Sequence, residues 1–214
     1  MDLIEAIVNR RSVRKYQDKD VPDDLLVKAF ESARYAPSGG NFQGWKFLVI
    51  KNKDMIAKIA DAAQNKLDII TGWPEAEKFG DTPAQYRQRA VFFRNAPVLV
   101  AAVGGQYQSI TDKILALRGK DDPYVKEITA NRNAAPTRVQ QIGGIVAHLL
   151  LIFHSQGLGA CWMAGPLIAK KEIEKLLGIS GEWDLMALIP VGYPAQTPEC
   201  KDKKTVKELV TFVR

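Results

Sequence analysis

The sequence predicts a single domain that mixes helices with strands, of the α/β or α+β class. Apolar runs with helical spacing alternate along the chain with short runs of aromatic and β-branched residues, which are typical of strands. The 214 residues, 46% of them hydrophobic, suit one globular domain with a sizeable core. Since no repeat or low-complexity tract divides the sequence, we expect one domain over residues 1–214.

The first half of the chain is expected to contain four helices and two strands. Pro22 followed by two acids marks one helix start, because acids suit the positive end of a helix dipole, and Asp54 is expected to cap another. Residues 66–82 show no clear periodicity and are expected to be irregular. The expected helices cover residues 2–9, 22–33, 54–65 and 83–93, and the expected strands cover residues 45–50 and 96–103.

An apolar run at residues 137–156 dominates the second half of the chain. Its apolar residues leave little polar face, which predicts a helix buried on nearly all sides and ended by Gly157. Residues 106–133 have weak periodicity and mixed charge, and we expect this segment to shape a substrate pocket. After the long helix we expect a strand at 160–163, a helix at 169–177 and a strand at 185–191.

The charge of the chain favours small anionic ligands. The formal net charge is +6, yet the basic residues are interleaved with 24 acids and form no long basic run. We interpret the excess of positive charge as a feature that keeps the protein soluble and attracts anionic cofactors and substrates. A non-enzymatic, basic nucleic-acid-binding protein is the less favoured alternative, and it predicts binding that falls steeply with salt.

The sequence carries no sign of secretion, membrane insertion or a metal site. The N-terminus holds acids and no long apolar core, and the most apolar run, residues 142–153, is shorter than the ~20 residues that span a bilayer. The two cysteines, Cys161 and Cys200, form neither a disulfide framework nor a zinc pattern. We therefore expect a cytoplasmic protein without a bound metal.

The sequence also lacks a self-sufficient set of catalytic side chains. It contains no phosphate-binding or dinucleotide-binding glycine motif in the required context, no H-E-x-x-H and no G-x-S-x-G. His148 and His154 lie on the apolar helix and are expected to be core residues, and Cys161 is expected to be a small buried hydrophobe. Chemistry is therefore expected to come from a bound cofactor.

A basic cluster follows the first expected helix directly, with the sequence R-R-S-V-R-K-Y at residues 10–16. Each Arg presents a rigid fork of donors that matches phosphate oxygens, and Ser12 adds a hydroxyl. The cluster indicates an anion site suited to a phosphomonoester. The alternative is a solvated basic turn at a helix C-terminus, where cations suit the dipole.

Four blocks together resemble the FMN-dependent nitroreductase family. The basic cluster is the first, and A-P-S-G-G-N-F-Q-G-W-K-F at residues 36–47 is the second. The third is G-L-G-A-C-W-M-A-G-P at residues 157–166, and the fourth is A-L-I-P-V-G-Y-P at residues 187–194. The blocks occur in family order across most of the chain. Gly44 departs from the pattern, which usually has Pro at that position.

The resemblance implies an α+β nitroreductase-like fold, with a mixed sheet flanked by helices, built as an intertwined homodimer. It implies FMN as the cofactor, with Pro37, Ser38, Gly39 and Asn41 reaching the flavin of the partner subunit. Lys replaces the more usual Arg in the tail, and a solvated surface is the alternative for those lysines. The other implied FMN contacts are Arg10, Arg11, Ser12 and Arg14 at the phosphate and ribityl chain, Met163, Ala164 and Gly165 as backbone donors beside the ring, and Lys201 and Lys203 over the phosphate.

The activity implied by the resemblance is that of an FMN-dependent oxidoreductase. It would take hydride from NADH or NADPH and reduce a nitroaromatic or quinone-type acceptor by a ping-pong mechanism, with the flavin as catalyst and no catalytic side chain. The alternatives on the same fold are flavin fragmentation, dehalogenation and azoline oxidation. The choice of nicotinamide and acceptor depends on residues 66–95 and 106–133, which match no motif.

Overall fold

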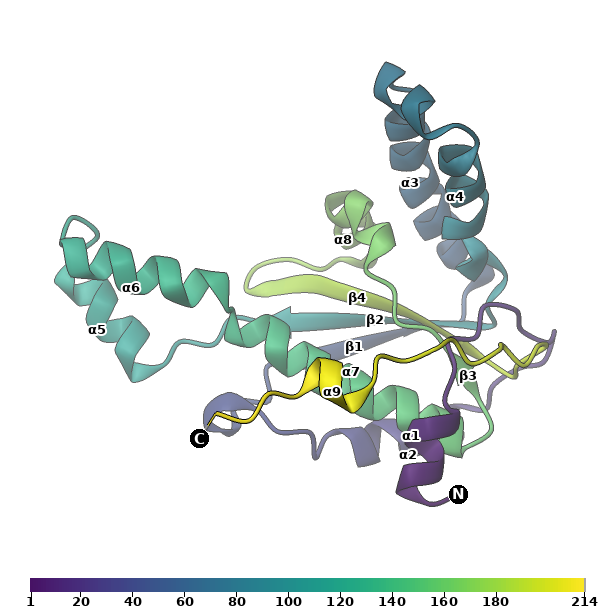
Figure 1. The fold of residues 1–214 in the computed structure, drawn as a ribbon, viewed down its shortest axis with the longest axis horizontal. Coiled ribbons are helices and arrows are strands. Elements are labelled where there is room, and N and C mark those ends of the chain that lie inside the picture. The colour runs from purple at the N-terminus through teal and green to yellow at the C-terminus, as the bar shows by residue number, and fades with distance from the viewer. Residues whose placement is uncertain (214) are drawn as a thin grey trace.

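A computed structural model describes residues 1–213 and shows a four-stranded sheet flanked by helices (Figure 1). The strands lie in the order β1-β2-β4-β3 and pair antiparallel throughout. A parallel bridge from Ser12 to Ala160 joins the N-terminal segment to the β3 edge. These features confirm the α+β class. The strands are β1 (Trp45–Ile50), β2 (Val98–Gly105), β3 (Gly159–Ala160) and β4 (Trp183–Gly192).

The helices occupy most of the remaining chain. The α-helices are α1 (Leu3–Asn9), α2 (Asp23–Ala33), α3 (Lys53–Thr71), α4 (Thr82–Ala90), α5 (Ile110–Arg118), α6 (Pro123–Ala134), α7 (Thr137–Ser155), α8 (Lys170–Leu177) and α9 (Val206–Leu209). The short 3-10 helices are η1 (Gly39–Asn41), η2 (Pro74–Phe79), η3 (Phe92–Asn95) and η4 (Gly165–Ala169).

Strand β2 separates two hydrophobic cores and is buried along its whole length. Its side chains alternate between the faces of the sheet, as strand geometry requires. Val100 packs in the core that holds α2 and α7, whereas Leu99 packs in the core that holds α3 and α8. Helices therefore cover both faces of the sheet.

Helix α3 starts and ends differently from the sequence expectation. Its cap is Asn52, whose side-chain oxygen accepts a hydrogen bond from the Met55 backbone N–H at 2.8 Å, and not Asp54. The helix continues to Thr71 because the apolar face extends as far as Leu67, which is buried. The expectation of irregular structure from residue 66 was therefore wrong over the last turns of this helix.

Residues 106–133 fold into the helical pair α5 and α6. A capping box between Ser109 and Asp112 starts α5, and Asp122 caps α6. The guanidinium of Arg132 pairs with the carboxylate of Asp112 at 2.7 Å and ties the two helices together. Polar caps and an ion pair, rather than apolar periodicity, hold this segment. Figure 1 shows that the α5–α6 pair and the α3–α4 pair both extend away from the sheet.

Helix α7 is buried on one face only. Ile145, Val146 and Leu149 pack into the core beneath the sheet, whereas Ala147 and His148 are exposed. The expectations that this helix is buried on nearly all sides, and that His148 is a core residue, were wrong for the single chain. An apolar helix with an exposed face of this kind suits contact with another protein surface.

No helix within residues 1–213 is both long and apolar enough to cross a lipid bilayer.

Candidate functional site

A cavity of about 750 Å³ lies between the N-terminal basic segment, α4 and the start of η4. Five of the residues expected from the sequence line it together: Arg14, Met163, Ala164, Gly165 and Lys201. The other lining residues are Lys15, Tyr86, Gln88, Arg89, Ala90, Phe92, Cys161, Trp162, Pro166 and Gln196.

The charged residues that line this cavity are all basic. They are Arg14, Lys15, Arg89 and Lys201, and no Asp or Glu of the described chain is among the lining residues. Cationic walls without acids attract and hold anions. The tail lysine Lys201 is therefore part of the cavity wall, which favours the anion-site interpretation of this residue over a purely solvated surface.

Backbone pairing with β3 positions Arg14. The Val13 backbone N–H donates to the Ala160 carbonyl at 3.1 Å, which holds the basic segment against the sheet edge. The Arg14 guanidinium lies 5.8 Å from the centre of the Phe92 ring, within cation–π range. The basic segment, β3 and η3 thus meet at one end of the cavity.

The Met163–Gly165 segment forms another part of the cavity wall and is held by β4. The Met163 N–H donates to the Leu188 carbonyl at 2.9 Å, and Leu188 returns the bond at 3.1 Å. This pairing occupies the Met163 donor that the sequence analysis assigned to a flavin ring. Ala164 and Gly165 stand at the start of η4, where the first N–H groups of a helix lack partners within it.

Some expected phosphate ligands lie outside the cavity lining. Arg11 points back to the first helix, where its guanidinium donates to the Val8 carbonyl at 2.6 Å. Arg10, Ser12 and Lys203 also belong to adjoining segments rather than to the lining. These residues remain candidates for FMN binding. Burial raises the pKa of the Cys161 thiol, whereas Arg14, Ser12 and Arg10 lower it, so these three side chains lie near one residue of the cavity wall.

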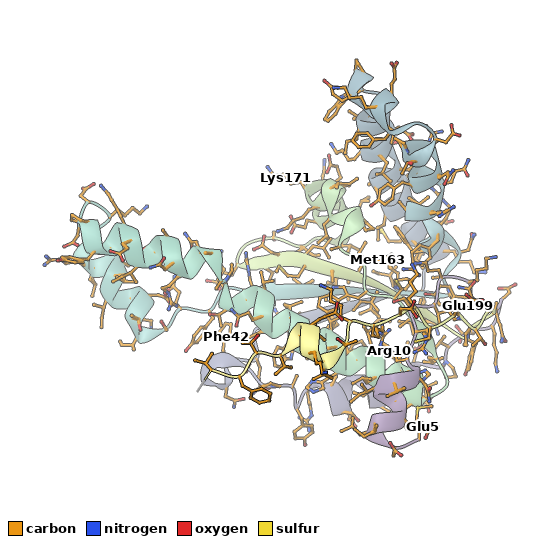
Figure 2. The ribbon with its side chains drawn as sticks, in the orientation of Figure 1. Glu5, Arg10, Phe42, Met163, Lys171 and Glu199 are labelled. Carbon is orange, nitrogen blue, oxygen red and sulfur yellow. The ribbon has the colours of Figure 1, made fainter. Side chains whose placement is uncertain are left out.

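The Pro37–Asn41 loop lies elsewhere on the molecule. Figure 2 shows Phe42, beside this loop, well apart from Arg10 and Met163. Gly40, Asn41 and Gln43 have positive φ angles of 58°, 54° and 50°. The Gln43 N–H donates to the Ser38 hydroxyl oxygen at 3.1 Å, which stabilises this uncommon backbone.

Gly39 and Gly40 let the loop pack closely against the residues behind it. A Cβ atom on Gly40 would come 2.8 Å from the Tyr107 hydroxyl, and one on Gly39 would come 3.3 Å from the Gln141 side-chain nitrogen. That nitrogen is buried and has no hydrogen-bond partner within the described chain. The sequence analysis did not single out Gln141, which lies behind this loop, because nothing in the sequence distinguishes it from the polar residues around it.

Helix α4 also contributes cavity residues that the sequence analysis did not assign. Tyr86 and Arg89 line the cavity, and the Tyr86 hydroxyl lies 3.3 Å from where a Cβ atom on Gly165 would stand. Expecting a helix here was correct in outline. The side that faces the cavity was not evident, because the helix has few apolar residues to mark its inner face.

The cysteine and histidine side chains have different surroundings. Cys161 is 3% exposed, as expected for a small buried hydrophobe, and burial raises the pKa of its thiol. His154 is half-buried, and its pKa is lowered by burial first and then by the nearby charges of Arg10 and Arg11. At neutral pH the His154 imidazole is therefore neutral and the Cys161 thiol is protonated, and we assign neither side chain a role as an acid or a base.

Comparisons with known proteins give a consistent assignment. A "Putative NADH dehydrogenase/NAD(P)H nitroreductase" from Methanothermobacter thermautotrophicus is 29% identical over 94% of this chain and 82% of its own length. A BluB-like flavoprotein from Clostridium difficile 630 is 31% identical, with a TM-score of 0.84 over the whole of both chains.

The fold is shared more widely than the sequence. An oxidized iodotyrosine deiodinase, solved with FMN and 3-iodo-L-tyrosine, has a TM-score of 0.73 at 22% identity, over 99% of this chain and 100% of that one. The model of the family described as "Nitroreductase family" matches residues 7–193, which is most of the sequence. The resemblance inferred from the four sequence blocks is confirmed, and the chain belongs to the Nitroreductase family.

Proposed function

We propose that this protein is an FMN-dependent oxidoreductase that takes electrons from NADH or NADPH and reduces aromatic acceptors such as nitroaromatics or quinones. The observation that carries the proposal is the cavity itself. Exclusively basic charged residues line it, and one wall is the Met163–Gly165 segment of the third sequence block. The proposal agrees with the names of the relatives, which include a putative NAD(P)H nitroreductase and a flavoprotein.

The residues present fit FMN by chemistry and by space. Arg14 and Lys201 supply charge for a phosphate, and the adjoining Arg10, Arg11, Ser12 and Lys203 can complete the set once the ligand orders them. Gly165 has no side chain on the side that faces Tyr86, which keeps this part of the cavity open for a flat ring. The N–H groups of Ala164 and Gly165 are the donors that we assign to the ring.

When bound, FMN supplies the redox chemistry, accepting hydride from the nicotinamide and passing reducing equivalents to the acceptor. The protein's residues would bind and orient the cofactor. The basic residues hold the phosphate end, and the N–H groups of Ala164 and Gly165 hold the ring end. No side chain is required as an acid or base, so we assign no catalytic residue. Because the donor and the acceptor use the same cavity in turn, we propose ping-pong kinetics.

We also propose a homodimer, in which Pro37, Ser38, Gly39 and Asn41 complete the cavity of the partner subunit. Phe42, which directly follows this loop, lies well apart from Arg10 and Met163 in one chain, and this supports the arrangement (Figure 2). Large apolar side chains left exposed by the single chain support it too. They lie on α1, α7 and the C-terminal segment, and include Leu3 at 66%, Ile4 at 67%, Val139 at 51% and Phe212 at 80% exposure.

Reductive dehalogenation of an aromatic substrate is the second candidate. The observation that favours it is the fold shared with a deiodinase, since one scaffold can host several chemistries. Both candidates use FMN and an aromatic ligand, and they differ in the acceptor that restores the oxidised flavin.

Steady-state kinetics on the FMN-loaded protein test the proposal. We expect NADH or NADPH to be oxidised in the presence of a nitroaromatic or a quinone, with parallel double-reciprocal lines as each substrate is varied. Intersecting lines would contradict the shared cavity. Turnover with a halogenated phenol, and none with a nitroaromatic or a quinone, would replace the reductase assignment with the second candidate.

A further inference from the structure

We propose that Arg89 and Tyr86 on α4 select an aromatic acceptor that carries an anionic group, such as a carboxylate on the ring. The inference rests on the proposed function, because it names the substrate class of the same cavity. It adds a recognition pair that belongs to neither the four sequence blocks nor the residues assigned to FMN.

The two side chains lie on the face of α4 that lines the cavity. They are three residues apart, so they are neighbours on one side of the helix, separated by about one turn. The Tyr86 hydroxyl reaches the beginning of η4 beside Gly165, at the end of the cavity assigned to the flavin ring. Arg89 is therefore about one helical turn from the ring end of the cavity.

Arg89 differs from its neighbours in having no ionic partner. Arg87, two residues earlier, pairs with Asp68 of α3 at 3.5 Å, and Arg94 pairs with Asp61 at 2.6 Å. Within residues 1–213, Arg89 forms neither a salt bridge nor a side-chain hydrogen bond, and no acid lines the cavity that it faces. Arg87 and Arg94 fasten α4 and η3 to α3, whereas the Arg89 guanidinium is available to a ligand.

The chemistry of the pair matches an aromatic carboxylate. A guanidinium binds a carboxylate through two parallel N–H donors, and a phenol can donate a further hydrogen bond. Because Arg14 and Lys201 reach the cavity from other elements and are assigned to the FMN phosphate, Arg89 and Lys15 remain as charge for the second ligand, and of these two only Arg89 shares a helix face with Tyr86. A neutral nitroaromatic would leave this guanidinium without an anion.

Calorimetric titration of the oxidised holoprotein tests the proposal directly. The probes are 4-nitrobenzoate and nitrobenzene, which share the ring and the nitro group and differ by the carboxylate. We expect the wild type to bind 4-nitrobenzoate more tightly. Arg89→Gln should weaken 4-nitrobenzoate by roughly 10–100-fold, the range for a hydrogen bond to a charged group, and leave nitrobenzene nearly unchanged.

Two further variants make the test specific. Arg87→Gln removes a positive charge from the same helix at a residue outside the cavity lining, and should leave both affinities unchanged. Tyr86→Phe should weaken 4-nitrobenzoate by less than Arg89→Gln does. Equal weakening of both probes by Arg89→Gln, or the same loss with Arg87→Gln, would overturn the proposal.

The readout separates this inference from the proposed function. Binding to the oxidised protein needs no electron transfer, so selective loss with Arg89→Gln would stand even if NADH and NADPH failed to reduce the flavin. FMN affinity is measured for each variant by flavin fluorescence. A large loss of FMN affinity with Arg89→Gln would assign Arg89 to the cofactor and overturn its role in acceptor selection.

Discussion

The hydroxyl of Tyr86 lies 3.3 Å from the position that a Cβ atom on Gly165 would take, so α4 meets η4 at a residue without a side chain. We predict that Gly165→Ala displaces the Tyr86 hydroxyl and weakens FMN binding slightly, because Tyr86 is 53% exposed and its side chain can yield to the new methyl group. FMN affinity is measured by fluorescence titration. The Tyr86→Phe variant lacks the hydroxyl oxygen that the new methyl group would meet. Gly165→Ala should therefore reduce FMN affinity less in that variant than in the wild type. An equal cost in both backgrounds would argue against this contact.

Arg14 is expected to recognise the phosphate of FMN. Arg14→Ala should weaken FMN by ~1.5–3 kcal/mol, the scale of a charged hydrogen bond, because it removes a guanidinium from the cavity wall. Riboflavin lacks the phosphate and should bind almost as before. Arg34→Ala serves as the control, since Arg34 stacks on Tyr35 outside the cavity lining. If Arg14→Ala or Arg10→Ala weakens both flavins equally, that arginine belongs to the solvated basic turn.

The exposed face of α7 is expected to lie in a dimer interface. Ala147→Glu introduces a charge at an exposed position, so it should leave the stability of the single chain nearly unchanged and weaken the dimer. Analytical ultracentrifugation measures the dissociation constant, and Val27→Glu on the exposed face of α2 is the control. We expect an obligate interface above ~2,000 Å². A stable FMN-loaded monomer at micromolar concentration would be incompatible with the proposed assembly.

The ion pairs of Asp184 make stability depend on pH. Lys170 donates to this carboxylate at 2.8 Å and Arg138 also donates to it, and the Lys170 bond is the main cause that lowers the Asp184 pKa. A lowered pKa in the folded state stabilises the fold above the ordinary Asp value of about 3.9, and this contribution is lost as pH falls through the folded-state pKa.

Urea unfolding measures this effect. Asp184→Asn should lower the free energy of unfolding by about 1–2 kcal/mol at neutral pH, and the difference should shrink as the pH falls below about 4. Asp24→Asn, which breaks an exposed pair with Lys28, is the control and should have little effect. A loss for Asp184→Asn that stays constant with pH would mean that packing, and not charge, makes the contribution.

Elements with strong apolar periodicity were predicted well from the sequence. The strand at Trp45–Ile50 and the long helix at Thr137–Ser155 match their expected bounds closely, because tertiary packing and local pattern agree there. Residues 106–133 were not recognised as helices, since caps and the Arg132–Asp112 pair hold them instead of an apolar stripe. His148 was misplaced because an apolar run in a single sequence does not distinguish the core face of a helix from an exposed face.

Part of the cavity lining matches residues singled out from the sequence, whose role in FMN binding stays a prediction. Arg14, Met163, Ala164, Gly165 and Lys201 meet in one cavity although they come from distant parts of the chain. Arg89 was not predictable, because one of two arginines on a polar helix carries no local signal. Only the structure distinguishes Arg89 from Arg87, because it shows that Arg87 pairs with Asp68.

Anaerobic mixing of the FMN-loaded protein with NADH or NADPH alone tests the central claim most directly. The account predicts that at least one nicotinamide bleaches the flavin absorbance, and that a nitroaromatic or a quinone added afterwards restores it. Flavin that stays oxidised with both nicotinamides would contradict the account.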